Sequence, residues 1–345
     1  MKFKDKIDIF IITYNRSKKL QKTLEQLLCV NSPINNFEIF IIDNNSTDNT
    51  ENIVKEFQLN HANLKYQKNK YNIGGNANIV KAFYKASKDY VWVLADNDDY
   101  SWESWKQVEQ GVIDNNDAII VAVFDNPRYD VATLFIQATF LPGVIYKTSL
   151  IDDTVMGNME FNISNMFPHL ALSSKLINED LKISCVDNSV VINGDNYDEN
   201  GEYEYTRGYQ KDSIHPLQRD MNWFTGYANS LHMIKDKKTR NYIIRNNKCC
   251  AGLNSAQAFY FNKKESNGSI YNMLSIFSVL NWSDKVRFLL NMIFVNSLYL
   301  FVYIHVEKRF VNNNTELQVI WRMKLFNCIK TNLFKYKKKL KRIVR

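Results

Sequence analysis

Three carboxylates stand together in the segment Asp96-Asn97-Asp98-Asp99, directly after five apolar or small residues. Clustered carboxylates repel one another, and a hard divalent cation bound between them relieves the repulsion and commonly bridges to phosphate oxygens. Asp96 and Asp98 therefore predict a site for Mn²⁺ or Mg²⁺ that also holds a diphosphate. The segment alone leaves open a second interpretation, in which the acids form a solvated turn.

The residues before this segment indicate where it lies. The run of residues 90–94 is short, consists mainly of β-branched and aromatic residues and contains no charged side chain, which predicts a buried strand. Open α/β sheets bind ligands at the carboxyl ends of their strands. The acids therefore occupy the position that a ligand site requires.

Strand and helix patterns alternate through the first hundred residues. Strand patterns lie at residues 7–13, 37–42, 64–66 and 90–94. Of the helix patterns between them, the first starts at Ser17 and is ended by Pro33 and Asn35-Asn36, and the other two lie at residues 50–57 and 78–87. This alternation predicts an α/β fold with a doubly wound, mostly parallel sheet and helices on both faces.

The pattern is less regular after Asp99. It predicts helices at residues 102–111 and 158–176, with Pro168 lying early in the second helix or kinking it, and strands at residues 118–124, 143–147 and 183–191. Residues 194–215 are typical of a loop, and a mainly helical C-terminal region follows from Pro216.

Each of the first four strands ends in a polar cluster. The clusters are Thr13-Tyr14-Asn15-Arg16, Asp43-Asn44-Asn45-Ser46, Asn72-Ile73-Gly74-Gly75 and the acidic segment. In a parallel sheet these loops meet at one edge, where Asp43 can accept from a base or ribose and Gly74-Gly75 can open a helix toward an anion. Any single cluster could instead be an ordinary Asx turn and helix cap.

The four clusters, in this order and spacing, closely resemble those of family 2 glycosyltransferases with the GT-A fold, including bacterial surface-polysaccharide enzymes. The resemblance covers roughly residues 7–150. It implies an inverting transferase acting on a nucleotide-diphosphate sugar, with Thr13, Asn15 and Asp43 at the nucleoside and Asn72 at the nucleotide or sugar. Asp96 and Asp98 would form the D-x-D motif, with Asp98 the firmest metal ligand and Asn97 standing where the family more often has an acid. The substrate-binding set that follows is Thr13, Tyr14, Asn15, Arg16, Asp43, Asn45, Asn72, Gly74, Gly75, Asp96 and Asn97.

The catalytic base departs from the family pattern. The family usually places a Glu-Asp pair at the head of a helix well after the D-x-D motif, whereas this chain has Asn165-Met166-Phe167-Pro168-His169 in that region. A neutral imidazole can take a hydroxyl proton near pH 7, so His169 is the predicted base. His169 could instead bind the acceptor sugar or pack at a helix start, and competing bases are Asp99, Asp152, Asp153 and Glu160.

The composition indicates a folded, intracellular protein. Of the 345 residues, 45% are hydrophobic, which is enough for a real core. The five cysteines show no metal or disulfide spacing, and the first eight residues lack the apolar stretch of a secretory signal. We therefore expect a cytoplasmic location.

The net charge of +8 comes from the C-terminal tail. Residues 321–345 contain ten Lys or Arg and no acid, interleaved with aromatic and aliphatic residues, a pattern suited to an anionic membrane surface. A solvated helix is the alternative, and nucleic acid is disfavoured because the rest of the chain has no basic surplus. Residues 288–304 are apolar but too short for a span, so we expect a core or interfacial helix.

These patterns predict a domain plan. Residues 1–215 form the GT-A domain, with a nucleotide-sugar half at about 1–125 and an acceptor half at about 126–215. Residues 216–320 form the helical region and residues 321–345 the basic amphipathic tail. The predicted partners are a nucleotide-sugar donor (UDP-sugar favoured), a glycan or lipid-linked acceptor, and the cytoplasmic face of a membrane.

Other classes of function are less well supported. A non-catalytic nucleotide-sugar or glycan binding module on the same scaffold is the main alternative. An oxidoreductase is disfavoured because no G-x-G-x-x-G follows the first strand. A metal phosphohydrolase remains a weaker possibility.

Overall fold

The structure is a computed structural model of the chain. It describes residues 2–123, 130–194 and 226–246, together with residues 223, 277–279, 282 and 285–286. The chain divides into two compact units, Met1–Asn291 and Met292–Arg345, and every described residue belongs to the first. The predicted segments 288–304 and 321–345 lie outside the described residues, and the domain boundaries stay a prediction.

A seven-stranded sheet organises the described part of the chain. In spatial order its strands are β3 (Leu64–Lys68), β2 (Ile39–Asp43), β1 (Ile7–Thr13), β4 (Tyr90–Ala95), β7 (Val144–Lys147), β6 (Ala118–Ile120) and β8 (Ile183–Cys185). The first four strands are mutually parallel, β7 runs antiparallel to both of its neighbours, and β8 is parallel to β6. The predicted mostly parallel sheet is therefore confirmed.

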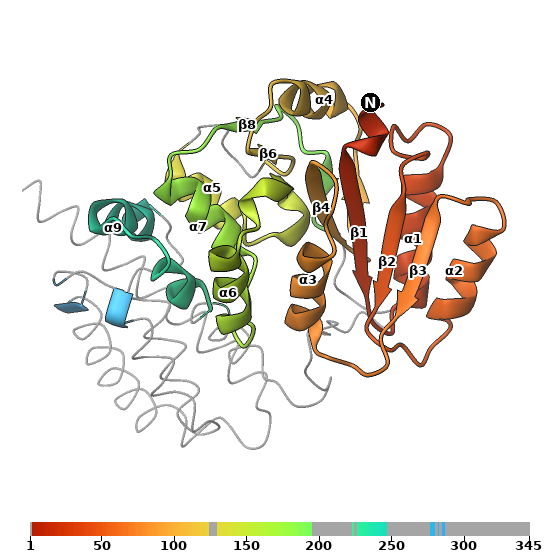
Figure 1. Cartoon of the computed structure of the whole chain (residues 1–345), viewed down its shortest axis with the longest axis horizontal. Coiled ribbons are helices and arrows are strands. Elements are labelled where there is room, and N and C mark those ends of the chain that lie inside the picture. The colour runs from red at the N-terminus through yellow and green to blue at the C-terminus, as the bar shows by residue number, and fades with distance from the viewer. Residues whose placement is uncertain are drawn as a thin grey trace, which may run out of the picture. The chain divides into compact units, whose positions relative to one another are not determined.

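Successive side chains of a strand point to opposite faces of the sheet, and both faces of this sheet are apolar. Ile7, Ile9 and Ile11 of β1 are buried in one core with the apolar residues of α1 (Ser17–Leu28), α2 (Thr50–Gln58) and α4 (Trp105–Ile113). Phe10 lies on the opposite face, where α3 (Gly75–Tyr84) packs against β1 and β4. Helices therefore cover both faces, as predicted (Figure 1).

The remaining described elements complete this unit. The helices are α5 (Val131–Gln137), α6 (Asp153–Phe161), α7 (Leu170–Asn178) and α9 (Lys237–Asn246), with short 3-10 turns at Phe3–Asp5, Leu141–Gly143 and Thr148–Leu150. A second, two-stranded antiparallel sheet joins β5 (Asp99–Tyr100) to β9 (Val191–Ile192). Within the described residues, no helix has both the length and the apolar character needed to cross a bilayer.

Two predicted elements were wrong in extent. The helix expected at 158–176 is two helices, α6 and α7, because Asn162 and Asn165 form side-chain hydrogen bonds that compete with the helix and Pro168 disfavours helical geometry before it. The strand expected at 183–191 is divided between β8 and β9, which pair in different sheets. The other predicted strands and helices within the described residues exist, most of them with ends shifted by a few residues. The predicted loop beyond residue 194 and most of the predicted helical region from Pro216 lie outside the described residues.

Trp92 anchors the strand that carries the acids. It is fully buried in β4, its indole N–H donates to the Pro142 carbonyl at 2.8 Å, and its ring contacts those of Tyr100 and Trp105. These contacts fix the end of β4 and hence the start of the acidic segment.

Candidate functional site

The loops at the carboxyl ends of β1, β2 and β4 are joined by direct hydrogen bonds. Thr13 Oγ1 donates to Asp96 Oδ2 at 2.7 Å, which links the end of β1 to the acidic segment. Asn15 N donates to Ser46 Oγ at 2.8 Å, and Thr47 N donates to Asn15 Oδ1 at 2.7 Å. The structure thus brings three of the four predicted clusters together at one edge of the sheet.

Asp96 is held by a buried ion pair. Arg16 Nη1 lies 3.0 Å from Asp96 Oδ1, and the two side chains are only 11% and 4% exposed. The same Arg16 nitrogen donates to Asn97 Oδ1 at 3.3 Å. Arg16 therefore supplies positive charge at the acidic segment and orients both Asp96 and Asn97.

Asp98 and Asp99 face different surroundings. Asp98 is 1% exposed, and its Oδ1 accepts from the Gly194 amide at 3.1 Å. Asp99 is turned toward α1, where Lys22 Nζ lies 2.7 Å from its Oδ1 and Gln26 donates to the same oxygen at 3.2 Å. Asp98 is therefore buried and bound to Gly194, whereas Asp99 is engaged by α1.

Asp43 at the end of β2 has no exposed surface. Its Oδ1 accepts from the amide and hydroxyl of Ser46 at 2.8 and 2.6 Å, and its Oδ2 accepts from the Tyr66 hydroxyl. Burial, together with the bond to Asp43, raises the pKa of Tyr66, so the phenol remains a donor. Asp43 thus shapes this loop, in which Asn45 adopts a left-handed backbone with φ of 70°, and its contact with a nucleoside stays a prediction.

A network of asparagines places the third cluster. Asn44 Nδ2 donates to Asn72 Oδ1 at 2.7 Å, while Asn44 Oδ1 accepts from Ile73 N at 2.9 Å. Asn72 Oδ1 also accepts from Gly74 N, and Gly74 has φ of 85°, a conformation that favours glycine. The turn from Asn72 to Gly74 is therefore fixed, and Gly75 begins α3 with its amides at the carboxyl edge.

The segment between α6 and α7 is tied to the same edge. Asn76 in the first turn of α3 donates to the carbonyls of Ile163 and Asn165. The Asn165 side chain in turn accepts from Asn229 at 2.9 Å. Residues 163–165 therefore lie beside the start of α3, next to the predicted donor site.

The predicted base lies deeper in this segment. His169 has no exposed surface, its Nε2 is 2.9 Å from the Ala138 carbonyl, and its ring contacts that of Phe167. Among the competitors, Asp152 caps α6 and pairs with Lys175, whose hydrogen bond lowers the pKa of that carboxyl. Asp153 and Glu160 are exposed. The base assignment stays a prediction.

The side chains present are suited to a hard divalent cation. Asp96 and Asp98 offer carboxylate oxygens, and Mg²⁺ is commonly held by one or two carboxylates with the remaining positions filled by substrate phosphate and water. Among the described residues no group of three or more His, Cys, Asp or Glu gathers in a metal-binding arrangement. Two carboxylates match the number that such a cation commonly takes from a protein, and the assignment of Asp96 and Asp98 to a cation stays a prediction.

Some positions at this edge were missed by sequence reasoning. Asn44 lies in the polar cluster after β2, but the predicted substrate-binding set contains its neighbour Asn45 and omits Asn44. The direction of a side chain is not visible in a loop sequence. Asn76 and Tyr66 gave no signal beyond their polarity. Gly194 was assigned to the start of a loop, and its contact with Asp98 spans 96 residues of sequence.

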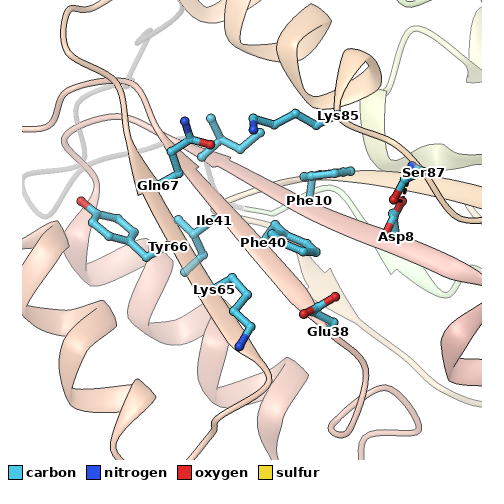
Figure 2. A pocket seen from close by; sticks show the side chains of 11 residues that line it. Asp8, Phe10, Glu38, Phe40, Ile41, Lys65, Tyr66, Gln67, Lys85 and Ser87 are labelled. Carbon is cyan, nitrogen blue, oxygen red and sulfur yellow. Dashed lines mark hydrogen bonds between the residues drawn. The ribbon is translucent and has the colours of Figure 1, made fainter.

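A hollow of about 380 Å³ lies on one face of the sheet. It covers the outer face of β1, β2 and β3 and is lined by residues such as Phe10, Phe40, Lys65 and Lys85 (Figure 2). Asp8 in this hollow accepts from the amides of Ser87 and Lys88, which gives it a structural role. The candidate site is therefore the carboxyl edge.

Comparison with known proteins identifies related sequences. Residues 8–181, half of the chain, match the family described as glycosyl transferase family 2. One relative is the GalNAc(5)-diNAcBac-PP-undecaprenol beta-1,3-glucosyltransferase of Campylobacter jejuni, which is 30% identical over 95 residues, or 27% of this chain and 30% of that protein. The chain thus spans about a third of the length of the curated relatives that it matches.

Solved structures share the fold. Staphylococcus aureus TarS 1–349 in complex with UDP has a TM-score of 0.53 and 17% identity, with 83% of this chain and 89% of that chain covered. The mannosyltransferase PcManGT from Pyrobaculum calidifontis, in complex with GDP-Man and Mn²⁺, has a TM-score of 0.52 and 12% identity, covering 83% and 84%. These similarities support a GT-A fold.

Proposed function

The chain belongs to glycosyltransferase family 2, and we propose that it is an inverting glycosyltransferase. The donor would be a nucleotide-diphosphate sugar, with UDP-sugars favoured, and the acceptor a glycan or lipid-linked glycan. One observation carries the proposal: Thr13 and Arg16 bind Asp96 at the carboxyl edge of the sheet, where a ligand site is expected, and the buried Asp98 follows two residues later.

The donor would be held by groups that the fold already orients. Asn72, fixed by Asn44, would contact the nucleotide or sugar. The amides at the start of α3 would face the diphosphate, because the first N–H groups of a helix attract anions. Asn15 and Asn45, both with left-handed backbone, would shape the loops around the nucleoside.

Charge on the leaving diphosphate would be offset from two sides. Asp98 and Asp96 would hold Mn²⁺ or Mg²⁺, and the bound cation would stabilise the departing diphosphate as a Lewis acid. Arg16 would keep Asp96 oriented and add fixed positive charge close to the diphosphate. Such fixed charges need little reorganisation during the reaction.

A non-catalytic binding module is the second candidate. One observation favours it: His169 is fully buried and Asp99 is paired with Lys22, so neither predicted catalytic group is presented to an acceptor. A binding module would bind nucleotide sugars with metal but would not release nucleoside diphosphate. Turnover therefore separates the two candidates.

The proposed setting is the cytoplasmic face of a membrane. The Campylobacter jejuni relative is named for an undecaprenol-linked substrate, which supports a lipid-linked acceptor here. The ten bases among residues 321–345 would contact anionic lipid. This tail lies outside the described residues, so the membrane contact rests on its sequence.

The test of function is a donor panel. The full chain is incubated with UDP-, dTDP- and GDP-sugars, each with Mn²⁺ or with a chelator, and release of nucleoside diphosphate is measured. We expect Mn²⁺-dependent release from one nucleotide class, and NAD serves as a control that should not bind. Metal-dependent binding of a donor without turnover, also in the presence of candidate acceptors, would favour the binding module.

The role of His169 can be tested with two substitutions. Gln can keep a donor toward the Ala138 carbonyl but cannot act as a base, so we expect His169→Gln to retain most of the turnover because the ring is buried. His169→Ala should lower stability by about 1–3 kcal/mol, because the buried carbonyl loses its partner. Turnover and thermal melting are measured together. A loss of 10²–10⁴-fold in a folded His169→Gln protein, the range for general base catalysis, would instead establish His169 as the base.

A further inference from the structure

Gly194 lies against the acidic segment although it is distant in sequence. It follows β9, whose residues pair with β5 in the register Asp99 to Ile192 and Tyr100 to Val191. The Ser101 amide also donates to the Val190 carbonyl at 3.0 Å. This pairing carries the chain after β9 back over the peptide between Asn97 and Asp98.

The Gly194 amide holds the Asp98 carboxylate. Its N–H donates to Asp98 Oδ1 at 3.1 Å, and the Asp98 side chain is almost fully buried. A hydrogen bond from an amide to an ionised carboxylate is stronger than one between neutral groups. The bond therefore restrains the rotation of the carboxylate and directs Oδ1 toward Gly194.

The absence of a side chain at this position permits the close approach. A Cβ atom on Gly194 would lie 1.7 Å from the Asn97 carbonyl oxygen, 2.7 Å from the Asn97 carbonyl carbon and 3.0 Å from the Asp98 Cα. All three are backbone atoms, so no side-chain rotation relieves the overlap. Any other residue at 194 must displace either the segment that follows β9 or the acidic segment.

We propose that Gly194 is a positioning residue of the metal–diphosphate site. It sets the orientation of Asp98 by packing against the peptide between Asn97 and Asp98 and by donating a hydrogen bond to the Asp98 carboxylate. The proposal rests on the proposed function, because it assigns Asp98 to the cation. Gly194 acts through Asp98, so we expect its replacement to weaken metal binding.

The test compares Gly194→Ala with Gly157→Ala. Gly157 lies in α6, and a Cβ there meets nothing within 4 Å, so this control adds the same methyl group without a clash. Thermal melting of the full chain is followed while Mn²⁺ is titrated at saturating UDP, with dTDP and GDP in parallel. We expect the Mn²⁺ concentration for half-maximal stabilisation to rise at least tenfold in Gly194→Ala and to stay unchanged in Gly157→Ala.

The outcomes separate this inference from the function on which it rests. If wild type shows no metal-dependent stabilisation with any of the three diphosphates, the proposed function fails. If wild type responds and Gly194→Ala melts lower but shows the same Mn²⁺ dependence, Gly194 is only structural and the inference is overturned.

A second measurement does not depend on the folding of Gly194→Ala. Hydrogen exchange of residues 190–194 is compared between wild type and Asp98→Ala, and we expect faster exchange in the variant because the Gly194 amide loses its acceptor. Unchanged exchange would show that the two residues are not coupled.

Discussion

Replacing Asp98 with Asn is expected to abolish Mn²⁺-dependent stabilisation by nucleoside diphosphate and to reduce sugar transfer about 10³-fold. A cation that stabilises charge in the transition state contributes several kcal/mol, and about 4 kcal/mol corresponds to that factor. Asn has nearly the shape of Asp and keeps an oxygen that can accept from Gly194, so the substitution removes charge while disturbing packing little. Transfer rate and the metal-dependent shift in melting temperature are measured on the same samples.

The matched control is Asp89→Asn. Asp89 lies just before β4, at the opposite end of the strand that carries the acidic segment, and its ion pair with Lys6 is exposed. We expect its transfer rate and metal response to equal those of wild type. If Asp98→Asn keeps its dependence on Mn²⁺, Asp98 is not a metal ligand and the metal-assisted mechanism is wrong.

The parallel sheet could be predicted because its signals are local. Each of β1, β2 and β4 is a short apolar run, and the polar cluster after each run marks its carboxyl end. Once the strands are parallel, their ends share one edge, and because β1 lies next to β4 in the sheet, Thr13 comes close to Asp96. No knowledge of side-chain packing is needed for this step.

The acceptor side could not be predicted because it depends on contacts between distant residues. His169 has the sequence context of a helix start near a catalytic position, yet its environment is set by the Ala138 carbonyl at the end of α5. The break between α6 and α7 depends partly on Asn76 and Asn229, which bind the connecting segment from other helices. Helical periodicity continues across this segment and therefore predicted one helix.

The direction of side chains within a loop is equally invisible in sequence. Asn44 and Asn45 are adjacent and chemically identical, but only Asn44 is directed at Asn72 and Ile73. Asn45 adopts the left-handed backbone that turns the loop. The motif predicted the site, and the structure was needed to distinguish the residue that shapes the loop from the one that orients its neighbour.

Replacing Arg16 with Met should destabilise the metal-free protein by about 3–5 kcal/mol, the usual cost of leaving one partner of a buried ion pair uncompensated. The pair is buried on both sides, with Arg16 11% and Asp96 4% exposed. Met fills much of the same volume without charge, so the loss reports on the unpaired Asp96 carboxylate beside Asp98. For a domain of this size the melting temperature should fall on the order of 10 °C.

Two further variants decide whether charge is the cause. Lys22→Met breaks the pair with Asp99, in which the side chains are 64% and 41% exposed, so this loss should be at most about 1 kcal/mol. In the double variant Arg16→Met/Asp96→Asn the buried carboxylate is replaced by an amide, and much of the lost stability should return. Equal melting temperatures for Arg16→Met and wild type, or a double variant no more stable than Arg16→Met, would show that Arg16 does not neutralise the acidic segment. Recovery in the double variant would establish that the two buried carboxylates need a positive charge beside them before any metal or diphosphate is bound.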